Sequence, residues 1–503
     1  MRSPVLVVGA GPAGLVAALE LARRGEEVRL IERAEGPAAG SRAKGLQPRT
    51  LETLERLGVL DEVLDAGAAF PRWRSYRAGR LAWEKSIYEL LGMGEPVADP
   101  AVPYPETWML PQWRTEEILR RALSRVGVEV EYGSRLAGLD QSQDVVVAMI
   151  DGARRRQVLQ ASHVVAADGA GSTVRGLLGI SFEGVTREDE RFIIADVRTA
   201  DLDRRYWHNW SDPQDPAARV SVCPLPSSDT FQFVAPLLPD QDLPPLTVTT
   251  VQRLFDERSD GAEACFTDAS WITVSRTNER LASRFRDGRV FLVGDAAHAV
   301  PAAGGQGLNT AVEDSHNLGW KLAAVRRGAP ASVLDSYEEE RRPIAARLMA
   351  GLNSVDEHGT APDVLQLANS YRGYSLSLES RRPAGTVRAG DRAPDAPLRP
   401  AGEAPSRLFD VIRRADFTCI AFGDAAAATC AAASQEHTGR ISLRVLDVHR
   451  DSPATADAVR ATYGVPSDAE ALFVVRPDGY VGLAADDHYA TRLDAYLTRL
   501  TPA

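Results

Sequence analysis

The stretch VLVVGAGPAGLVAALELARRGEEVRLIER, residues 5–33, decides the fold class. It opens with a continuous apolar run, VLVV, which is typical of a parallel strand buried on both faces. The next segment has apolar residues at helical spacing and ends at Gly25, a residue that suits a helix terminus. EVRLIER then returns to strand character. We therefore predict a βαβ unit at the start of an α/β domain.

The turn of this unit carries a glycine motif, GAGPAG, at residues 9–14. GxGxxG alone is a weak signal, but here it follows a strand, opens a helix and precedes Glu32 at the end of the next strand. The glycines let the backbone approach a pyrophosphate, the helix start offers free N–H groups, and Glu32 can accept hydrogen bonds from a ribose. The pattern predicts a dinucleotide site but leaves NAD or FAD open. Its predicted residues are Gly9, Gly11, Pro12, Ala13, Gly14, Glu32 and Arg33.

Length and composition narrow the class of protein. The 503 residues exceed one ordinary core, so two or three domains are expected. The formal net charge of -11 argues against a nucleic-acid surface, and no apolar run is as long as a membrane span. The amino terminus enters a strand directly and shows no signal-peptide pattern. Four scattered cysteines without CxxC fit a reducing environment, so we expect a cytoplasmic protein.

The rest of the chain changes character twice. Strand-like stretches separated by Asp, Pro and Ser turns fill residues 180–275 and predict an inserted antiparallel sheet. PQWRTEEIL, from residue 111, predicts a helix with Thr115 as its N-cap, and residues 47–66 are also expected to be helical. Helices are also expected at 307–327 and 331–355. Beyond a linker rich in Arg, Pro and Gly, strands and a hairpin at Pro477-Asp478-Gly479 predict a small α/β domain.

Two further motifs follow predicted strands. HVVAADGAGSTVR, residues 163–175, contains Asp168-Gly169, and GDAAHAVPAAGGQGLN, residues 294–309, contains Gly294-Asp295. The acid and His298 of the second motif raise the alternatives of a metal site or a catalytic triad. Neither is favoured, because no clustered metal ligands accompany His298 and the chain has no GxSxG elbow.

GxGxxG, DG and GD in this order resemble the class A flavoprotein monooxygenases of the para-hydroxybenzoate hydroxylase type. GSRAKGLQPRTLE (40–52) and PQWRTEEIL (111–119) fit the same family. The resemblance covers about residues 1–355, and the rest is similar to the thioredoxin-like appendage of the phenol hydroxylase and aromatic polyketide hydroxylase branch. It implies an α/β fold whose parts are a Rossmann-like FAD-binding domain (1–72, 108–179 and 280–355), an inserted antiparallel β-sheet substrate domain (73–107 and 180–279), a helical or linker region (356–383) and a thioredoxin-like domain lacking CxxC (384–503).

The resemblance also implies roles for individual residues around FAD. Asp295 matches the aspartate that hydrogen-bonds the ribityl chain, and Arg42 matches an arginine near the phosphates. Asp168 is expected near the pyrophosphate, with Arg175 as an ion-pair partner in the core and His298 as a structural residue. The remaining expected cofactor contacts are Gln112, Pro301, Gly304, Gly305, Gly307, Leu308 and Asn309. One departure is that Pro301 is followed by Ala302-Ala303, where the family often has a second proline behind the flavin.

The family binds its substrate between the flavin and the inserted sheet. Strand alternation places Tyr206, His208 and Trp210 on one face and Trp207 and Asn209 on the other. Aromatic walls suit a flat apolar substrate, and His208 could help to deprotonate a phenol. The alternative is that these aromatic residues only pack the sheet. The expected pocket residues are Trp73, Tyr76, Trp207, His208, Trp210, Gln232 and Phe233.

The resemblance implies an FAD-dependent monooxygenase that hydroxylates a phenolic or polyketide-type aromatic compound. In such enzymes NADPH or NADH binds transiently and O2 forms a flavin C4a-hydroperoxide, so few catalytic side chains are expected. Baeyer–Villiger oxygenation or inactivation of an antibiotic on the same fold stays an alternative, as does a non-catalytic flavin redox sensor. No metal and no nucleic acid are expected as partners, and the chain is expected to be a monomer or homodimer.

Overall fold

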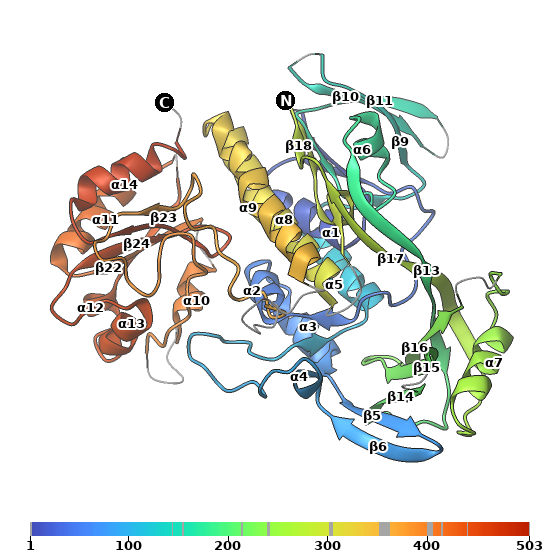
Figure 1. Ribbon diagram of the computed structural model, residues 1–503. Helices are drawn as coiled ribbons and strands as arrows, with labels where there is room; N and C mark the ends of the chain where they lie inside the picture. The colour runs from blue at the N-terminus through green and yellow to red at the C-terminus, as the bar shows by residue number, and fades with distance from the viewer. Residues whose placement is uncertain are drawn as a thin grey trace.

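The computed structural model describes residues 3–142, 144–152, 155–212, 215–238, 242–300, 305–351, 363–399, 406–413, 416–439 and 441–501. Figure 1 shows three parts: a domain of orange and red elements, a sheet domain at the opposite side, and helices α8 and α9 between the first of these and the rest. The fold is α/β, as the sequence predicts, with separate sheets in each part.

A six-stranded sheet forms the centre of the first domain, in the order β18-β19-β12-β1-β2-β8. The strands are β1 (Val5–Val8), β2 (Val28–Ile31), β8 (Val130–Glu131), β12 (His163–Ala166), β18 (Arg286–Asp287) and β19 (Val290–Leu292). All neighbours run parallel except β18 and β19. The VLVV run is buried on both faces, which explains its continuous apolar character.

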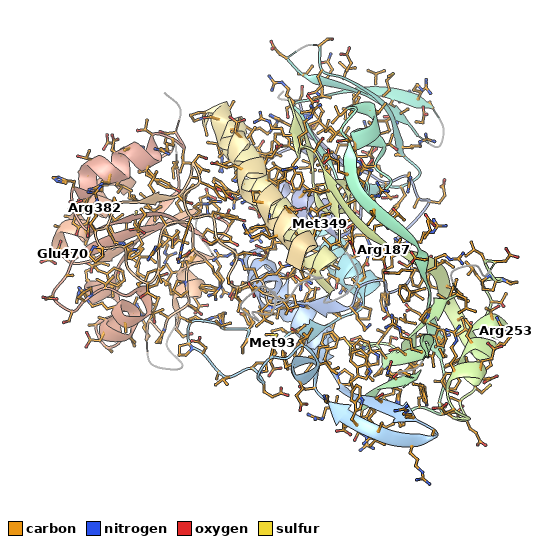
Figure 2. All side chains as sticks on the ribbon, in the orientation of Figure 1. Met93, Arg187, Arg253, Met349, Arg382 and Glu470 are labelled. Atoms are coloured by element: carbon orange, nitrogen blue, oxygen red, sulfur yellow. The ribbon has the colours of Figure 1, made fainter. Side chains whose placement is uncertain are left out.

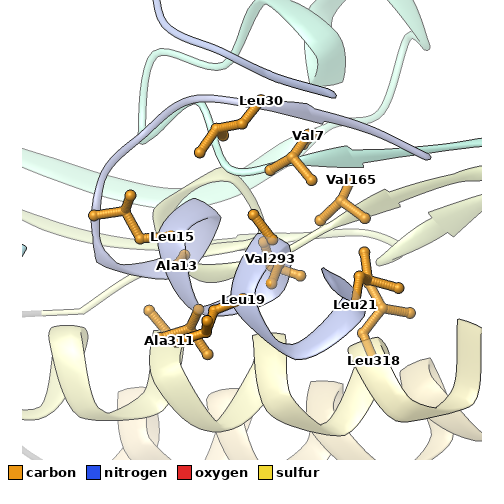
Figure 3. Packing of buried hydrophobic residues seen from close by; sticks show 14 of the residues in the cluster. Val7, Ala13, Leu15, Leu19, Leu21, Leu30, Val165, Val293, Ala311 and Leu318 are labelled. Atoms are coloured by element: carbon orange, nitrogen blue, oxygen red, sulfur yellow. The ribbon is translucent and has the colours of Figure 1, made fainter. Parts of the chain in front are cut away.

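Helices cover this sheet in layers. They are α1 (Pro12–Arg23), α5 (Gln112–Arg125) and α8 (Gln306–Arg326). Figure 3 shows α1 between the strands and α8, with Leu19 and Leu21 directed toward Ala311 and Leu318. A Cβ on Gly319 would lie 2.5 Å from Glu20 Cγ, so a glycine is needed where the two helices approach. The predicted N-cap Thr115 is wrong: Pro111 is the N-cap of α5, and Thr115 lies inside the helix.

A three-stranded antiparallel sheet packs on the same core. It comprises β9 (Arg135–Asp140), β10 (Val146–Asp151) and β11 (Arg156–Ala161), followed after β12 by α6 (Thr173–Leu177). Val146, Ala148 and Ile150 alternate inward along β10 and join the cluster that includes β1 and β12. The first domain therefore has a single apolar core.

The inserted sheet has eight strands in the order β20-β17-β13-β16-β15-β14-β5-β6. They are β5 (Arg72–Arg77), β6 (Arg80–Lys85), β13 (Phe182–Arg198), β14 (Tyr206–Asp212), β15 (Asp215–Pro224), β16 (Thr230–Leu237), β17 (Asp268–Ala282) and β20 (His298–Ala299). Neighbours are antiparallel except β14 and β5, which pair in parallel. Helix α7 (Val248–Arg258) covers one face with Val251, Leu254 and Phe255.

Short elements join the two domains. A small sheet of β3 (Gly45–Leu46), β4 (Ala68–Ala69) and β7 (Trp108–Met109) lies between them, and α4 (Ile87–Leu90) follows β6. The helical stretch expected over 47–66 consists of two helices, α2 (Pro48–Arg56) and α3 (Leu60–Ala66). They separate at Gly58, whose φ of +73° ends the first helix.

The carboxy-terminal domain is a five-stranded sheet, β21-β25-β24-β22-β23, with helices around it. Its elements are β21 (Leu378–Glu379), α10 (Leu408–Ile412), β22 (Phe417–Phe422), α11 (Asp424–Glu436), β23 (Leu443–Asp447), α12 (Val448–Asp451), α13 (Ala456–Tyr463), β24 (Ala471–Val475), β25 (Val481–Ala485) and α14 (Tyr489–Leu497). A βαβ unit is followed by a hairpin and a helix, in line with the expected thioredoxin-like class. Strand β21 lies in the segment expected to be linker.

The hairpin turn between β24 and β25 docks against the central helices through buried charges. We call Lys321, Glu340, Arg476 and Asp478 the seam network. Arg476 donates two hydrogen bonds to Glu340 of α9 (Asp335–Gly351) at 2.7 and 2.9 Å, and Lys321 of α8 donates to the same carboxylate at 2.7 Å. Asp478 accepts hydrogen bonds from Arg476 and from Trp320. Figure 2 shows side chains filling the space between the two parts. The domain is therefore joined to α8 and α9 by fully paired charges.

Candidate active site

The three glycines after β1 serve two different purposes. A Cβ on Gly9 would lie 2.3 Å from the Ala167 carbonyl oxygen, and one on Gly14 would lie 1.8 Å from the Gly9 carbonyl oxygen. Both glycines therefore permit close packing of strand and helix. A Cβ on Gly11, by contrast, would meet no described atom within 4 Å. Gly11 thus keeps open the approach to the first N–H groups of α1, where an anion binds favourably.

Glu32 is fixed beside this opening. Its carboxylate accepts hydrogen bonds from the backbone N–H groups of Ala10 and Ala34, both at 2.9 Å. A carboxylate has about four acceptor positions, so positions for further donors such as ribose hydroxyls are left. A cavity of about 500 Å³ begins here, and its lining includes Gly11, Glu32, Arg33, Arg42, Gln112 and Trp271.

Gln112 and Arg42 have different surroundings at the cavity wall. Gln112 accepts a hydrogen bond from the Ala43 N–H at 3.3 Å and donates one to Glu116 at 2.9 Å, so it holds the loop before β3 against α5. Arg42 is exposed and borders both this cavity and a neighbouring one of about 610 Å³. An accessible guanidinium at that position can approach a phosphate.

The DG turn after β12 is ordered by its own aspartate. Asp168 accepts hydrogen bonds from the Ser172 hydroxyl and the Val174 N–H, which fixes the start of α6. It also lines a cavity of about 170 Å³ together with Gly9 and Glu32. Arg175 donates to the carbonyls of Ala296 and Ala170 at 2.9 and 2.7 Å. The expected ion pair is thus replaced by hydrogen bonds that tie the DG turn to the GD turn.

The GD turn presents an accessible carboxylate. Gly294 has φ +56°, and its missing Cβ makes room for Ala311 of α8. The Asp295 side chain is accessible to solvent, although many protein atoms surround it. It has no hydrogen-bond or ion-pair partner among the described residues. Burial raises the pKa of this carboxyl, while His298 and Arg42 act in the opposite direction. Asp295 is therefore free to accept hydrogen bonds from hydroxyl donors.

His298 is part of a buried chain of polar contacts. Its Nε2 lies 2.6 Å from Asp314 Oδ2, and the other oxygen of Asp314 accepts from Arg341 Nε at 2.7 Å. Asp314 also accepts from the Gly294 N–H, so the histidine and the GD turn share one carboxylate. The described part of the chain holds no group of three His, Cys, Asp or Glu side chains that could bind a metal ion. His298 is a structural residue of this turn.

The first turn of α8 follows directly. Gly305 caps it with φ +65°, and a Cβ on Gly307 would contact Val300 at 3.5 Å, while Leu308 stays partly exposed. The Asn309 side chain accepts from the Gln47 N–H at 2.8 Å and donates to the Gly45 carbonyl at 2.9 Å. It therefore joins α8 to β3. Pro301 and Gly304 lie outside the described residues.

The face of the inserted sheet that meets the first domain holds only part of the expected pocket. Trp73 and Trp207 stack there with ring centroids 4.2 Å apart, and Gln232 lies on the same face. Trp207 also donates to Ser221 at 2.6 Å, whereas the buried indole N–H of Trp73 has no acceptor. We call these two stacked indole rings the aromatic wall.

The other four expected pocket residues lie on the opposite face. Tyr76, His208, Trp210 and Phe233 belong to the side that packs against α7, where Trp210 meets Phe255 edge to face at 5.1 Å. His208 is buried, its Nδ1 lies 2.9 Å from the Tyr76 hydroxyl, and its Nε2 lies 2.9 Å from the Asp203 carbonyl. Burial also lowers its pKa. This placement corrects the expectation of His208 as a base, because both ring nitrogens already have partners.

Comparison with known proteins agrees with this geometry. Residues 2–351 match the family model of an FAD binding domain, and residues 386–502 match that of the aromatic-ring hydroxylase carboxy-terminal domain. The chain belongs to the FAD-dependent aromatic-ring monooxygenases.

Relatives of the monooxygenase align over nearly its whole length. A flavin-dependent monooxygenase of Mycobacteroides abscessus is 41% identical over 489 residues, covering 96% of this chain and 97% of the relative. The 6-methylpretetramide 4-monooxygenase of Streptomyces rimosus is 32% identical, covering 99% and 93%. Among solved structures, the ternary complex of aklavinone-11 hydroxylase with FAD and aklavinone superposes with a TM-score of 0.83 at 28% identity, covering 99% of both chains.

The cleft of the monooxygenase fits FAD. Gly11 leaves the start of α1 accessible, Glu32 offers acceptors beside it, and Asp295 offers an unpartnered carboxylate beyond it. Use of NAD(P)H and O2 is typical of the family. No helix in the described part of the chain is long and apolar enough to cross a membrane.

Several residues of the site were missed from the sequence. Trp271 of β17 packs over Gly40, where a Cβ would lie 2.0 Å from the indole ring. Lys44 lies over the Trp207 ring, 4.2 Å from its centroid, and donates to Gln232. Ser41 donates to Asp196 of β13 at 2.9 Å. Ser41 and Lys44 stand inside the GSRAKGL motif, but only the pairing of the strands reveals which sheet residues they contact.

Proposed function

We propose that this monooxygenase hydroxylates a phenolic or polycyclic aromatic compound of the polyketide type, with NAD(P)H and O2 as co-substrates. The observation that supports the proposal best is the aromatic wall of Trp73 and Trp207. A flat aromatic ring stacks well on such a wall.

Different parts of the chain bind the cofactor and the substrate. Bound FAD supplies the activation of oxygen. The pyrophosphate-side residues Gly11, Glu32 and Arg42 hold the cofactor, with Asp295 accepting from its hydroxyls. The wall orients the substrate, and the surrounding sheet excludes water. The names of the tetracycline-type and aklavinone relatives favour the polyketide class.

The decisive experiment measures NADPH and NADH oxidation by the purified protein against phenols, naphthoquinones and polycyclic polyketides. Oxygenated product and H2O2 are scored separately. A compound that speeds oxidation and gains one oxygen supports the proposal, and the position of that oxygen separates hydroxylation from Baeyer–Villiger insertion or antibiotic inactivation. A protein that binds FAD but is stimulated by no compound of the panel favours the redox-sensor alternative.

Asp295→Ala tests the cofactor half of the proposal. We expect the variant to lose most of its FAD on purification, because the substitution removes an acceptor for the cofactor hydroxyls. The matched control is Asp335→Ala, an exposed carboxylate on α9, which should keep the wild-type flavin content. Wild-type FAD content in Asp295→Ala would contradict the assigned role.

The proposal also includes the oligomeric state and the cellular location. We expect a monomer or homodimer, to be checked by light scattering. A cytoplasmic location is supported by the four cysteines, all of which are free thiols.

A further inference from the structure

Lys44 is a cation placed where the first domain meets the inserted sheet. Its ammonium donates to the Gln232 side chain and lies 4.2 Å from the centre of the Trp207 ring. It lies deep in the protein, yet the residue is not fully covered. Among the described residues, no carboxylate is within ion-pair distance of it.

The titratable groups that face Lys44 from the neighbouring strands form no ion pair with it. Asp196 of β13 is the nearest acid. One of its oxygens accepts from Ser41, the other has no partner, and burial raises its pKa to about 6. Cys223 of β15 is the other titratable group, and burial raises the pKa of its thiol to about 12, so it is neutral. Gln232 and Trp207 carry no charge.

Enclosing a cation without a direct ion-pair partner is costly, and proteins do so mainly where a ligand or a proton loss supplies the balance. Burial lowers the pKa of Lys44 for the same reason. The hydrogen bonds of Gln232 hold the Lys44 ammonium in one place. Its amide nitrogen donates to the Ser41 carbonyl, which leaves its oxygen directed at the ammonium.

Lys44 is also next to a strand that contacts the first turn of α8, where the flavin ring is expected. It directly precedes Gly45 of β3, whose carbonyl accepts a hydrogen bond from Asn309 in the first turn of α8. The same lysine contacts Trp207 of the aromatic wall. One side chain therefore connects the turn that faces the cofactor with the wall that faces the substrate.

We propose that Lys44 binds the ionised oxygen of the aromatic substrate and so selects acidic phenols and enols. The inference rests on the proposed function. When the substrate enters as a neutral phenol and Lys44 as an amine, the O–H bond breaks and an N–H bond forms. The proton moves to Nζ and the electron pair stays on oxygen, with no change in oxidation state. The resulting anion is more electron-rich and thus more reactive toward oxygen transfer.

The test uses ligand binding to the oxidised holoenzyme without NAD(P)H, followed through perturbation of the flavin absorbance. The probes are 4-nitrophenol, at a pH above its own pKa, and 4-nitroanisole, a neutral analogue. Wild type should bind the anion about tenfold or more tightly than the neutral analogue, as expected for a charge-assisted hydrogen bond. Lys44→Met should lose this preference, and Lys44→Arg should keep most of it.

Two further variants make the result unambiguous. Lys85→Met removes an exposed lysine of β6 and should behave as wild type. Gln232→Glu keeps Lys44 but gives it an internal counter-charge, so the preference for the anion should fall even if Lys44→Met fails to fold or to load FAD. The proposal is overturned if the wild type shows no preference or no probe binding, or if both Lys44→Met and Gln232→Glu keep the wild-type preference.

These outcomes are separable from the function itself. Preference for the anion without any oxygenated product would remove the proposed reaction but keep the anion site. Product formation with equal use of neutral and ionised substrates by wild type and Lys44→Met would keep the reaction and remove the role of Lys44.

Discussion

Two lysines of this chain are enclosed in similar ways but have opposite surroundings. Lys321 lies in the seam network, 2.7 Å from Glu340, and burial lowers its pKa to about 8. Lys44 lies between two domains, and its pKa is also lowered by burial, yet no described carboxylate pairs with it. The charge of Lys321 is paired within the protein, whereas Lys44 has no ion-pair partner until a ligand binds. Burial alone does not distinguish these two lysines. The presence or absence of an ion-pair partner separates the structural interface from the proposed binding site.

The largest expected effect comes from breaking the complete network. Arg476→Met should lower the free energy of unfolding by about 3–5 kcal/mol, because it leaves Glu340 and Asp478 buried with fewer partners. Denaturant titration measures this loss. The matched control is Arg372→Met, which removes an exposed pair with Asp391 and should cost at most about 1 kcal/mol. Equal effects of the two variants would mean that the seam is not a stabilising interface.

The next effect concerns the acid beside the incomplete site. The folded-state pKa of Asp196 is about 6, above its unfolded value, so the folded protein binds this proton more tightly. Its contribution to stability is full below about pH 4 and is lost as pH rises through about 6. The shift corresponds to about 3 kcal/mol. The stability difference between wild type and Asp196→Asn should therefore change by up to that amount between these pH values.

The seam carboxylates should behave in the opposite sense. The neighbouring cations lower the pKa values of Glu340 and Asp478 despite burial, so their contribution is present above the unfolded pKa of about 4 and is lost only below it. The free energy of unfolding of wild type and of Asp196→Asn can be compared between pH 4 and 7. If it changes in the same way in both proteins, the pKa of Asp196 is not raised.

The sequence predicted the parts of the cleft that depend on local pattern. These local features are GxGxxG after an apolar strand, Glu32 at the end of the next strand and Gly305 before α8. In the structure each of them lies at the strand or helix end that the sequence pattern predicts. The alternation along β14 was also predicted correctly. The wrong pocket residues arose because alternation gives two faces but does not say which one meets the first domain. That choice depends on α7 covering Trp210 and Phe233, a contact that no local pattern encodes.

A smaller effect is expected at the open glycine. Gly11→Val should weaken FAD binding about tenfold or more, since a side chain would fill the approach to α1, while apo-protein stability should change by about 1 kcal/mol. Flavin content and thermal unfolding of the apo form are the measurements. Gly14→Val is the contrasting variant: its Cβ meets the Gly9 carbonyl, so folding itself should fail. Loss of folding in both would remove the distinction between the two glycines.

The smallest expected effect is at His208. His208→Gln should leave the pH dependence of kcat/KM unchanged, because this histidine packs in the core beside Tyr76 and does not reach the aromatic wall. The pH profile with the best substrate of the panel gives the measurement. Loss of the acidic limb, the fall of kcat/KM at low pH, in the variant would restore His208 as a proton acceptor.

The parallel pairing of β14 with β5 bears on how the chain folds during synthesis. The hairpin of β5 and β6 leaves the ribosome early, while its partner β14 follows only after α5 and the strands β8 to β13. Until then one edge of the hairpin has unpaired backbone groups, and such an edge is prone to pair with other chains. Contacts so distant in sequence also form slowly. Slow synthesis or a shortage of chaperones should therefore cause aggregation first through this edge, before the carboxy-terminal domain has been synthesised.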